Sequence, residues 1–68
     1  MKASSGKELC AVLERHGWQL RRITESHHVY AKPEQKVRLS VPVHGNTPLK
    51  VGLLRHLLKA AEIDPSEL

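Results

Sequence analysis

The sequence predicts a small α+β fold in which three antiparallel strands form one sheet and two helices cover one face of it. Three observations carry this prediction. Apolar residues recur at helical spacing near both ends of the chain. Between them, segment 37–44 alternates apolar and polar side chains, as does a strand with one buried face. Residues that favour turns separate the segments, so the expected order is α-β-β-β-α.

A first helix is expected at residues 5–16. Ser5 can accept a backbone N–H at the helix start, and Glu8 follows three residues later, which is the spacing of a capping box. One helical stripe then comprises Leu9, Val12, Leu13 and His16. Gly17 ends the helix, because glycine readily adopts the left-handed conformation found after helix C-termini.

Two strands are expected at residues 18–24 and 27–32. Side chains alternate between the faces of a strand, so the second run divides into His27, Val29 and Ala31 on one face and His28, Tyr30 and Lys32 on the other. We expect the face with His27 to lie toward the helices, with the imidazole partly buried. The face with Tyr30 is expected to be open.

The third strand, at residues 37–44, shows the clearest alternation, with an inward face of Val37, Leu39, Val41 and Val43. Pro42 cannot donate a hydrogen bond to the sheet, so that end of the strand is expected to be irregular or at an edge. A second helix is expected at residues 50–61, with a stripe of Leu54, Leu57, Leu58 and Ala61. Pro65 prevents its continuation, so the last residues are expected to form a short tail.

Length and composition exclude several classes of protein. A chain of 68 residues with 40% apolar content forms one small core and is too short for a multidomain enzyme. Cys10 has no disulfide partner, which fits a reducing cytoplasm. No apolar run approaches the ~20 residues that span a membrane, and segment 1–7 lacks the apolar core of a signal peptide. We expect one cytoplasmic domain over residues 1–68, with a core at 5–63 and an acidic C-terminal tail.

The net charge of +4 is distributed unevenly along the chain. Residues 15–59 hold nine Lys and Arg against two Glu, a balance of +7, and they also hold all five His. Residues 60–68 carry a balance of −3. Basic residues concentrated in one region are typical of nucleic-acid-binding proteins. An ordinary solvated surface explains the charge equally well.

The sequence offers few sets of residues for catalysis. The four glycines are scattered, so no phosphate-binding loop and no nucleotide cofactor are expected. With one Cys, and with His27 and His28 on opposite faces of a strand, no metal site is expected. An assembly of His27, His44 and His56 is the weaker alternative. A Ser-His-Asp triad is disfavoured because the only Asp, Asp64, lies in the tail.

Acid–base cleavage of RNA remains compatible with these residues. RNA supplies its own nucleophile, the 2′-hydroxyl. A ribonuclease therefore needs a base for that proton, an acid for the leaving 5′-oxygen and cations for the charge on the phosphate. Histidine can take either role, with a second His, a Lys, a Tyr or water as the other group. Trp18 is expected in the core rather than stacked on a base, whereas Tyr30 suits either base stacking or a plain position on the surface of the sheet.

Several short segments occur in a characteristic order: Gly17-Trp18, Ser26-His27-His28-Val29-Tyr30, Val41-Pro42-Val43-His44-Gly45, Leu49-Lys50, and Gly52 with Leu54-Arg55. Their order and spacing resemble those of the HicA toxins, the small ribonuclease components of bacterial and archaeal toxin–antitoxin pairs. The similarity extends over about residues 6–63. Each segment alone is a weak signal, but all of them in register within so short a chain form a specific match.

The resemblance implies a double-stranded-RNA-binding-domain-like fold, metal-independent cleavage of mRNA with growth arrest, and a HicB-type antitoxin that covers the active site. The family's catalytic His follows Gly-Ser and maps onto His27, as general acid or base. The family's Lys before the second helix maps onto Lys50, as a phosphate contact. We expect further RNA contacts from Arg22, Lys36, Arg38, Tyr30 and His28.

The chain departs from the family's pattern at three positions. Glu25 replaces the usual Gly, Val51 replaces the usual Pro, and Leu53 replaces a common Thr. An acidic side chain beside Ser26 could repel phosphate or orient His27. Two rival functions stay open. One is a non-catalytic RNA-binding module of the same fold, which Glu25 favours, and the other is an interaction protein whose only partner is an acidic antitoxin.

Overall fold

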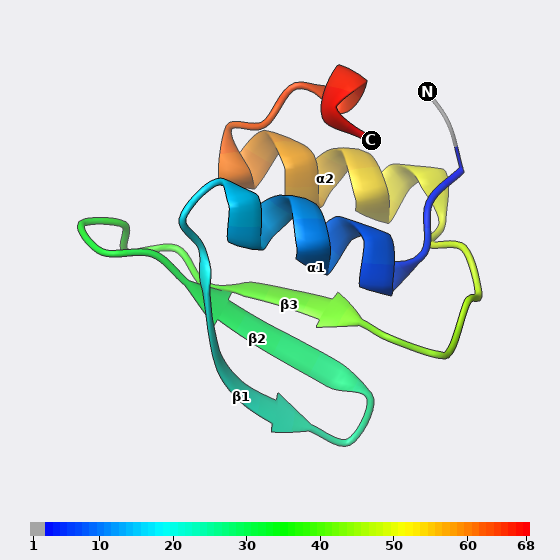
Figure 1. Cartoon of the computed structure of the whole chain (residues 1–68), viewed down its shortest axis with the longest axis horizontal. Coiled ribbons are helices and arrows are strands. Elements are labelled where there is room, and N and C mark those ends of the chain that lie inside the picture. Colours follow the sequence, from blue (N-terminus) through cyan, green and yellow to red (C-terminus); the bar gives the residue numbers. More distant parts are fainter. Residues whose placement is uncertain (1–2) are drawn as a thin grey trace.

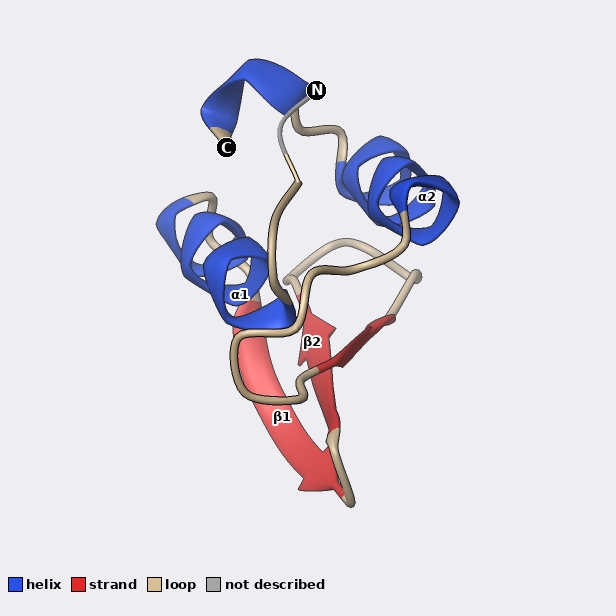
Figure 2. Ribbon diagram, turned by 90° about the vertical axis from the view of Figure 1, so that its right-hand side faces the viewer, coloured by secondary structure: helices blue, strands red, loops and turns tan. Residues whose placement is uncertain are grey.

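The computed structural model describes residues 3–68 and has the predicted order of helices and strands (Figure 1). The elements are α1 (Gly6–Arg15), β1 (Gln19–Thr24), β2 (His27–Ala31), β3 (Leu39–Pro42), α2 (Val51–Ala61) and the short 3-10 helix η1 (Pro65–Glu67). The strands form one antiparallel sheet in the order β1-β2-β3. Both helices lie on one side of this sheet (Figure 2), so the predicted fold class is confirmed. Residues 1–2 lie outside the described residues. They belong to segment 1–7, for which the sequence predicts no signal peptide.

Helix α1 begins where the capping box predicts it. The Glu8 backbone N–H donates to Ser5 Oγ at 3.2 Å, and the Ser5 backbone N–H donates to Glu8 Oε1 at 2.9 Å. These bonds satisfy two donors that a helix N-terminus otherwise leaves free. Gly17 follows the helix with a φ of 90°. The Trp18 N–H then donates to the Leu13 carbonyl at 3.0 Å, and the chain turns into β1.

The start of α1 packs directly on the end of β3. Gly6 is buried, and a Cβ atom at this position would overlap the Pro42 carbonyl oxygen. The segment before α1 is also bonded to the loop before α2, because the Leu49 N–H donates to the Ser4 carbonyl at 2.7 Å. These contacts fix the end of β3, where Pro42 pairs with His27 of β2.

Tyr30 determines which face of the sheet lies toward the helices. It pairs with Leu39 of β3, its side chain is 1% exposed, and its hydroxyl donates to Glu14 Oε2 at 2.6 Å. Burial, reinforced by this hydrogen bond, raises the pKa of Tyr30 far above its usual range. Because side chains alternate along a strand, His27 and Val29 project from the opposite face.

The predicted assignment of the two faces of β2 is therefore wrong. His27 is exposed on the face away from the helices, whereas Tyr30 is buried beneath them. His28 shares the helix side with Tyr30 and is half-buried. Alternation predicted the correct partition of residues but not which set is buried. Tyr30 is the residue that is buried, because its ring buries a large apolar area while Glu14 accepts a hydrogen bond from its hydroxyl.

Both helices and the sheet contribute to one hydrophobic core. Trp18 is 3% exposed and lies in the core as predicted, and Cys10, whose burial the sequence leaves open, is 7% exposed and lies there too. Burial also raises the pKa of the Cys10 thiol. The core is completed by apolar residues from every layer: Leu9, Val12, Leu13, Tyr30, Leu39, Val41, Leu54, Leu57, Leu58, Ala61 and Ile63.

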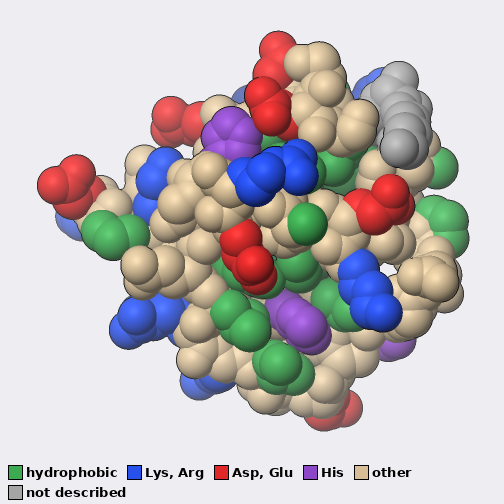
Figure 3. Space-filling model, viewed as in Figure 1, with side chains coloured by type: hydrophobic (Ala, Val, Ile, Leu, Met, Phe, Trp, Pro, Cys, Tyr) green, Lys and Arg blue, Asp and Glu red, His purple; other side chains and the backbone are tan. Residues whose placement is uncertain are grey.

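The sheet leaves some predicted inward residues uncovered. Strand β3 begins only at Leu39, so Val37, which was predicted to face inward, is 47% exposed. Leu20 and Ile23 of β1 lie on the helix side but are 43% and 56% exposed. The β1–β2 hairpin extends beyond the helices (Figure 1), and hydrophobic side chains reach the surface over this part of the molecule (Figure 3).

The C-terminal residues after α2 form the short 3-10 helix η1, and the segment that leads to it packs back on the helices. Ile63 is 5% exposed, and its N–H donates to the Leu58 carbonyl at 2.9 Å. Glu67 Oε1 lies 3.3 Å from His16 Nε2 at the end of α1. No helix among residues 3–68 combines the length and the apolar character needed to cross a membrane.

Replacing Gly6 with Ala is expected to lower the free energy of unfolding by about 1–3 kcal/mol, because the new Cβ collides with the Pro42 backbone. Gly52→Ala is the matched control, since a Cβ there meets no atom within 4 Å. That control should leave stability unchanged or raise it by up to about 1 kcal/mol. Urea unfolding followed by circular dichroism measures both. Equal effects of the two substitutions would contradict the close packing of α1 on β3.

Stability is expected to fall as the pH rises through about 10, because Tyr30 ionises there in the unfolded chain but stays protonated in the fold. Tyr30→Phe should remove this part of the decline, and any remaining decline above about pH 9 reports the Cys10 thiol. At neutral pH, Tyr30→Phe should cost about 1–2 kcal/mol through the lost bond to Glu14. Urea unfolding across this pH range tests the prediction, and parallel curves for wild type and variant would refute it.

Candidate nucleic-acid interface

His27 is the first residue of β2 and follows a two-residue turn, Glu25-Ser26, at the end of the hairpin. Its backbone pairs with Thr24 of β1 on one side and with Pro42 of β3 on the other. Pairing on both sides fixes the position of the backbone, whereas the side chain is exposed. The structure therefore holds an accessible imidazole at a defined place on the sheet.

The turn before His27 contains a strained residue. Glu25 has a φ of 54°, a left-handed conformation that side chains with a Cβ adopt at a cost. Glu25, which departs from the Gly of the pattern that the sequence resembles, thus has a glycine-like backbone conformation. The turn is anchored next to the strain, because the Val43 N–H donates to the Ser26 carbonyl at 2.7 Å.

A second histidine reaches the same turn. His44 follows β3, and its Nε2 lies 3.3 Å from Ser26 Oγ, at an exposed position. Which of the two atoms donates depends on the tautomer of the imidazole. Ser26 therefore precedes His27 in the chain and contacts His44 through its side chain. The sequence contains both within the family's segments, but only the structure brings His44 to the turn before His27.

The face of the sheet turned away from the helices is named here the open face. Register assigns to it Gln19, Arg22, Thr24, His27, Val29, Ala31, Ser40 and Pro42. A β-bulge between Leu20 and Arg22 interrupts the alternation of β1. Arg22 pairs with Val29, and Arg21 lines a hollow together with Ala31, so both arginines lie on this face. Simple alternation would have separated them.

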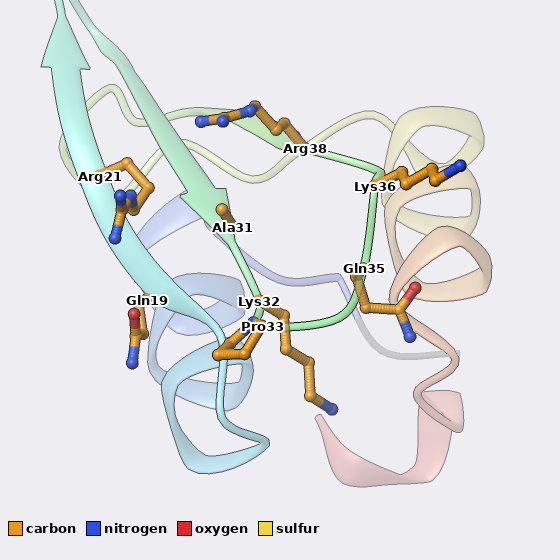
Figure 4. Close-up of a pocket in the computed structure, with 8 residues that line it drawn as sticks. All are labelled: Gln19, Arg21, Ala31, Lys32, Pro33, Gln35, Lys36 and Arg38. Carbon is orange, nitrogen blue, oxygen red and sulfur yellow. The ribbon is translucent and has the colours of Figure 1, made fainter.

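A hollow of about 390 Å³ lies at the end of the open face opposite to His27 (Figure 4). It is lined by Gln19, Arg21, Ala31, Lys32, Pro33, Gln35, Lys36 and Arg38. Two of the predicted RNA-binding residues, Lys36 and Arg38, thus line the same hollow, with their side chains pointing in opposite directions (Figure 4). Arg21 and Lys32 join them there, although the sequence analysis did not propose either as a contact.

The other predicted contacts lie outside the hollow. Arg22 occupies β1 on the same face as His27. Lys50 is exposed and caps the N-terminus of α2 with its backbone alone, because its carbonyl accepts the Leu54 N–H at 2.9 Å. The Lys50 side chain makes no capping bond, so its ammonium remains available to a ligand.

Tyr30 does not offer a surface for stacking, so its predicted RNA contact is wrong. Its side chain is 1% exposed and bonded to Glu14 beneath the helices. His28 is half-buried on the same side of the sheet, away from the open face. Trp18 and Tyr30 are the only Trp, Tyr or Phe residues of the chain, and both are buried. The open face therefore offers charged and hydrogen-bonding side chains rather than aromatic rings.

The Lys and Arg side chains of this region form no ion pair with a carboxylate of another described residue, whereas His16 pairs with Glu67. Within residues 3–68, no three His, Cys, Asp or Glu side chains are grouped to hold a metal ion. Unpaired guanidinium and ammonium groups on an open surface are the groups that proteins use to hold phosphates.

The order of elements, the single antiparallel sheet and the helices on one face define a small protein of double-stranded-RNA-binding-domain-like topology. The family model of the HicA toxins of bacterial toxin–antitoxin systems matches residues 6–63. The chain therefore belongs to the HicA toxin family, and the resemblance seen in its sequence segments is confirmed. A comparison with curated proteins found no match.

Glu25→Gly is expected to raise the free energy of unfolding by about 1 kcal/mol, because Gly adopts a positive φ without steric cost. Glu25→Ala is the control, since it removes the same carboxylate but keeps the Cβ. Urea unfolding of both variants separates backbone strain from charge. If Glu25→Ala stabilises the protein as much as Glu25→Gly, the strain at this turn is not the cause.

Proposed function

We propose that the protein is a metal-independent endoribonuclease that cleaves mRNA and arrests growth, as the toxin of a type II toxin–antitoxin system. The observation that carries the proposal is the placement of His27 in a HicA-family chain. Its imidazole is exposed, its backbone is fixed by two neighbouring strands, and it shares the open face with Arg22. A general acid or base needs this combination of access and fixed position.

The proposed reaction uses the nucleophile of the RNA itself. A base removes the proton of a 2′-hydroxyl, and that oxygen attacks the adjacent phosphorus. The bond from phosphorus to the 5′-oxygen breaks while an acid gives that oxygen a proton. The products are a 2′,3′-cyclic phosphate and a 5′-hydroxyl end. His27 serves as one of the two proton-transfer groups, and cations stabilise the negative charge that accumulates on the phosphate.

The second proton-transfer group is His44 or water. His44 is favoured by its position, because its Nε2 lies 3.3 Å from Ser26 Oγ in the turn that leads into His27. The contact with the Ser26 hydroxyl holds the His44 ring next to the turn that leads into His27. Histidine is suited to either role because it exchanges a proton near neutral pH.

Phosphate binding is assigned to Arg22 and Lys50, and to Lys36 and Arg38 at the far end of the open face. None of these four cations makes an ion pair within the described residues. Their charge is therefore not offset by a neighbouring carboxylate, which favours an anionic ligand.

Membership of a toxin–antitoxin family implies an antitoxin partner. We propose that this partner is a HicB-type protein and that it neutralises the toxin by covering the open face around His27. The cytoplasm, where mRNA is translated, is the proposed place of action.

A non-catalytic RNA-binding module is the second candidate function. Glu25 favours it, because a carboxylate beside Ser26 stands close to the place where the phosphate would bind. Such a module would bind RNA with strong salt dependence and leave it intact.

The decisive experiment compares purified wild type with His27→Gln and His44→Gln in an RNA cleavage assay that contains a chelator. His27→Gln should lower the rate by a factor of about 10²–10⁴, the usual contribution of a general acid or base. His44→Gln should lower it by a similar factor if His44 is the second group, and by less than tenfold if water is. His56→Gln, an exposed histidine on α2, is the matched control and should cleave like wild type.

Expression in a bacterium provides the second readout. Wild type should arrest growth, and His27→Gln should permit it at the same protein level. If folded His27→Gln cleaves RNA and arrests growth as wild type does, the assignment of His27 is wrong. If wild type binds RNA without cleaving it, the RNA-binding module replaces the proposed enzyme.

A further inference from the structure

We propose that the hollow at the far end of the open face is a second phosphate-binding site, which holds the backbone of a single RNA strand away from the bond that is cut. The inference extends the proposed function, since it states how far the bound RNA reaches. The hollow and His27 lie at opposite ends of β2. Four residue steps separate His27 from Ala31, which corresponds to ~13 Å along a strand, a distance of a few nucleotides.

The hollow is assembled from three parts of the chain. Gln19 and Arg21 come from β1, and Ala31 ends β2. The loop before β3 supplies the remaining residues. Figure 4 shows Arg21 and Arg38 on neighbouring elements that flank the end of β2, where Ala31 has only a methyl group. A small residue between two long cationic ones leaves room for a ligand.

The loop that closes the hollow has defined structure. The Gln35 N–H donates to the Lys32 carbonyl at 3.1 Å, and Glu34 adopts a φ of 71°. This turn reverses the chain and returns it toward β3. Lys32 is half-buried, and its Nζ lies 6.0 Å from the centre of the Trp18 ring. The contact with a buried ring restrains Lys32 at the edge of the hollow.

The charge of the lining identifies the ligand as an anion. Arg21, Lys32, Lys36 and Arg38 contribute four positive charges, and the two glutamines contribute amide donors. No carboxylate lines the hollow, and none of the four cations makes an ion pair within residues 3–68. An anion relieves the mutual repulsion of these groups, and guanidinium forks match phosphate oxygens in geometry.

An RNA phosphate fits the lining better than an acidic peptide does. The apolar lining consists of Ala31 and Pro33, which provide no deep pocket for the anchoring side chains of a peptide. The hollow is also continuous with the open face through Gln19 and Ala31, so one strand of RNA can reach it from His27. Contacts of this kind position a strand without reading its sequence.

The first test measures binding of an RNA that cannot be cleaved. A fluorescent 2′-O-methyl dodecanucleotide is titrated with wild type and with Arg21→Gln/Arg38→Gln, and anisotropy gives Kd at several salt concentrations. The double variant should bind at least tenfold more weakly, and the slope of log K against log salt should fall by about 1.4 for two lost contacts on a single strand. Both residues are exposed, so the fold should be unaffected, and thermal unfolding verifies this.

The matched control is Arg55→Gln/Lys59→Gln. It removes the same charge from two exposed residues of α2, on the helical side of the molecule. This control should keep the affinity within about twofold of wild type. Equal losses of RNA affinity in both double variants would show that net charge alone causes the effect and would overturn the proposal. The proposal would also be overturned if Arg21→Gln/Arg38→Gln lost affinity for a polyglutamate peptide but kept its affinity for RNA. That result would assign the hollow to an acidic protein.

The second test uses cleavage and substrate length. A dinucleotide has one phosphate, which must occupy the reaction centre, so it cannot reach the hollow. Wild type should therefore cleave a dodecanucleotide with a higher kcat/KM than a dinucleotide. Arg21→Gln/Arg38→Gln should reduce that ratio at least tenfold through KM. An unchanged ratio contradicts the second site while leaving His27 as the acid or base. If wild type cleaves neither RNA, the proposed endoribonuclease activity is refuted. The binding test then still shows whether the hollow is a phosphate-binding site.

Discussion

The structure depends on the burial of Tyr30 and on the hydrogen bond from its hydroxyl to Glu14. This one contact joins the middle strand of the sheet to α1 and decides which face of the sheet becomes the core. Since side chains alternate along β2, the same choice sends His27 to the open face. An aromatic ring that is 1% exposed, with its one polar atom satisfied by a carboxylate, is stable only with the helices on that side. The accessible histidine is thus a consequence of how the core is packed.

The open face is the side of the sheet that the helices do not cover, so its side chains are accessible to a ligand. The hairpin turn places His27 and Ser26 at one end with His44 beside them, and the loop before β3 closes a basic hollow at the other end. The bulge in β1 adds both Arg21 and Arg22 to this face. With Trp18 and Tyr30 buried in the core, the face offers charge and hydrogen-bond donors rather than aromatic rings. Such a surface suits contact with a phosphate backbone.

The sequence predicted features that depend on local chemistry and missed those that depend on distant contacts. The predictions of the capping box at Ser5, the order of elements and the buried position of Trp18 were correct. The prediction of which face of β2 is buried was wrong. Alternation divides the residues into two sets but does not say which set is buried, and that choice depends on Glu14, sixteen residues from Tyr30. The bulge at Arg21 and the packing of Glu67 near His16 leave no local sequence signal either. The role of His27 rests on the family's pattern, and its placement on the open face came from the structure.

We propose that RNA binds the open face of the sheet, with one strand running from His27 to the basic hollow. The most direct measurement is NMR chemical-shift mapping of the 15N-labelled protein during titration with a 2′-O-methyl dodecanucleotide, which lacks the nucleophile and stays intact. We expect the largest chemical-shift changes at His27, Arg22, Ser40 and Arg38. The amide signals of the exposed side of α2, around Arg55 and Lys59, should stay unchanged. Shifts concentrated on α2, or on the exposed Leu20 and Ile23 of the opposite side of the hairpin, would contradict it.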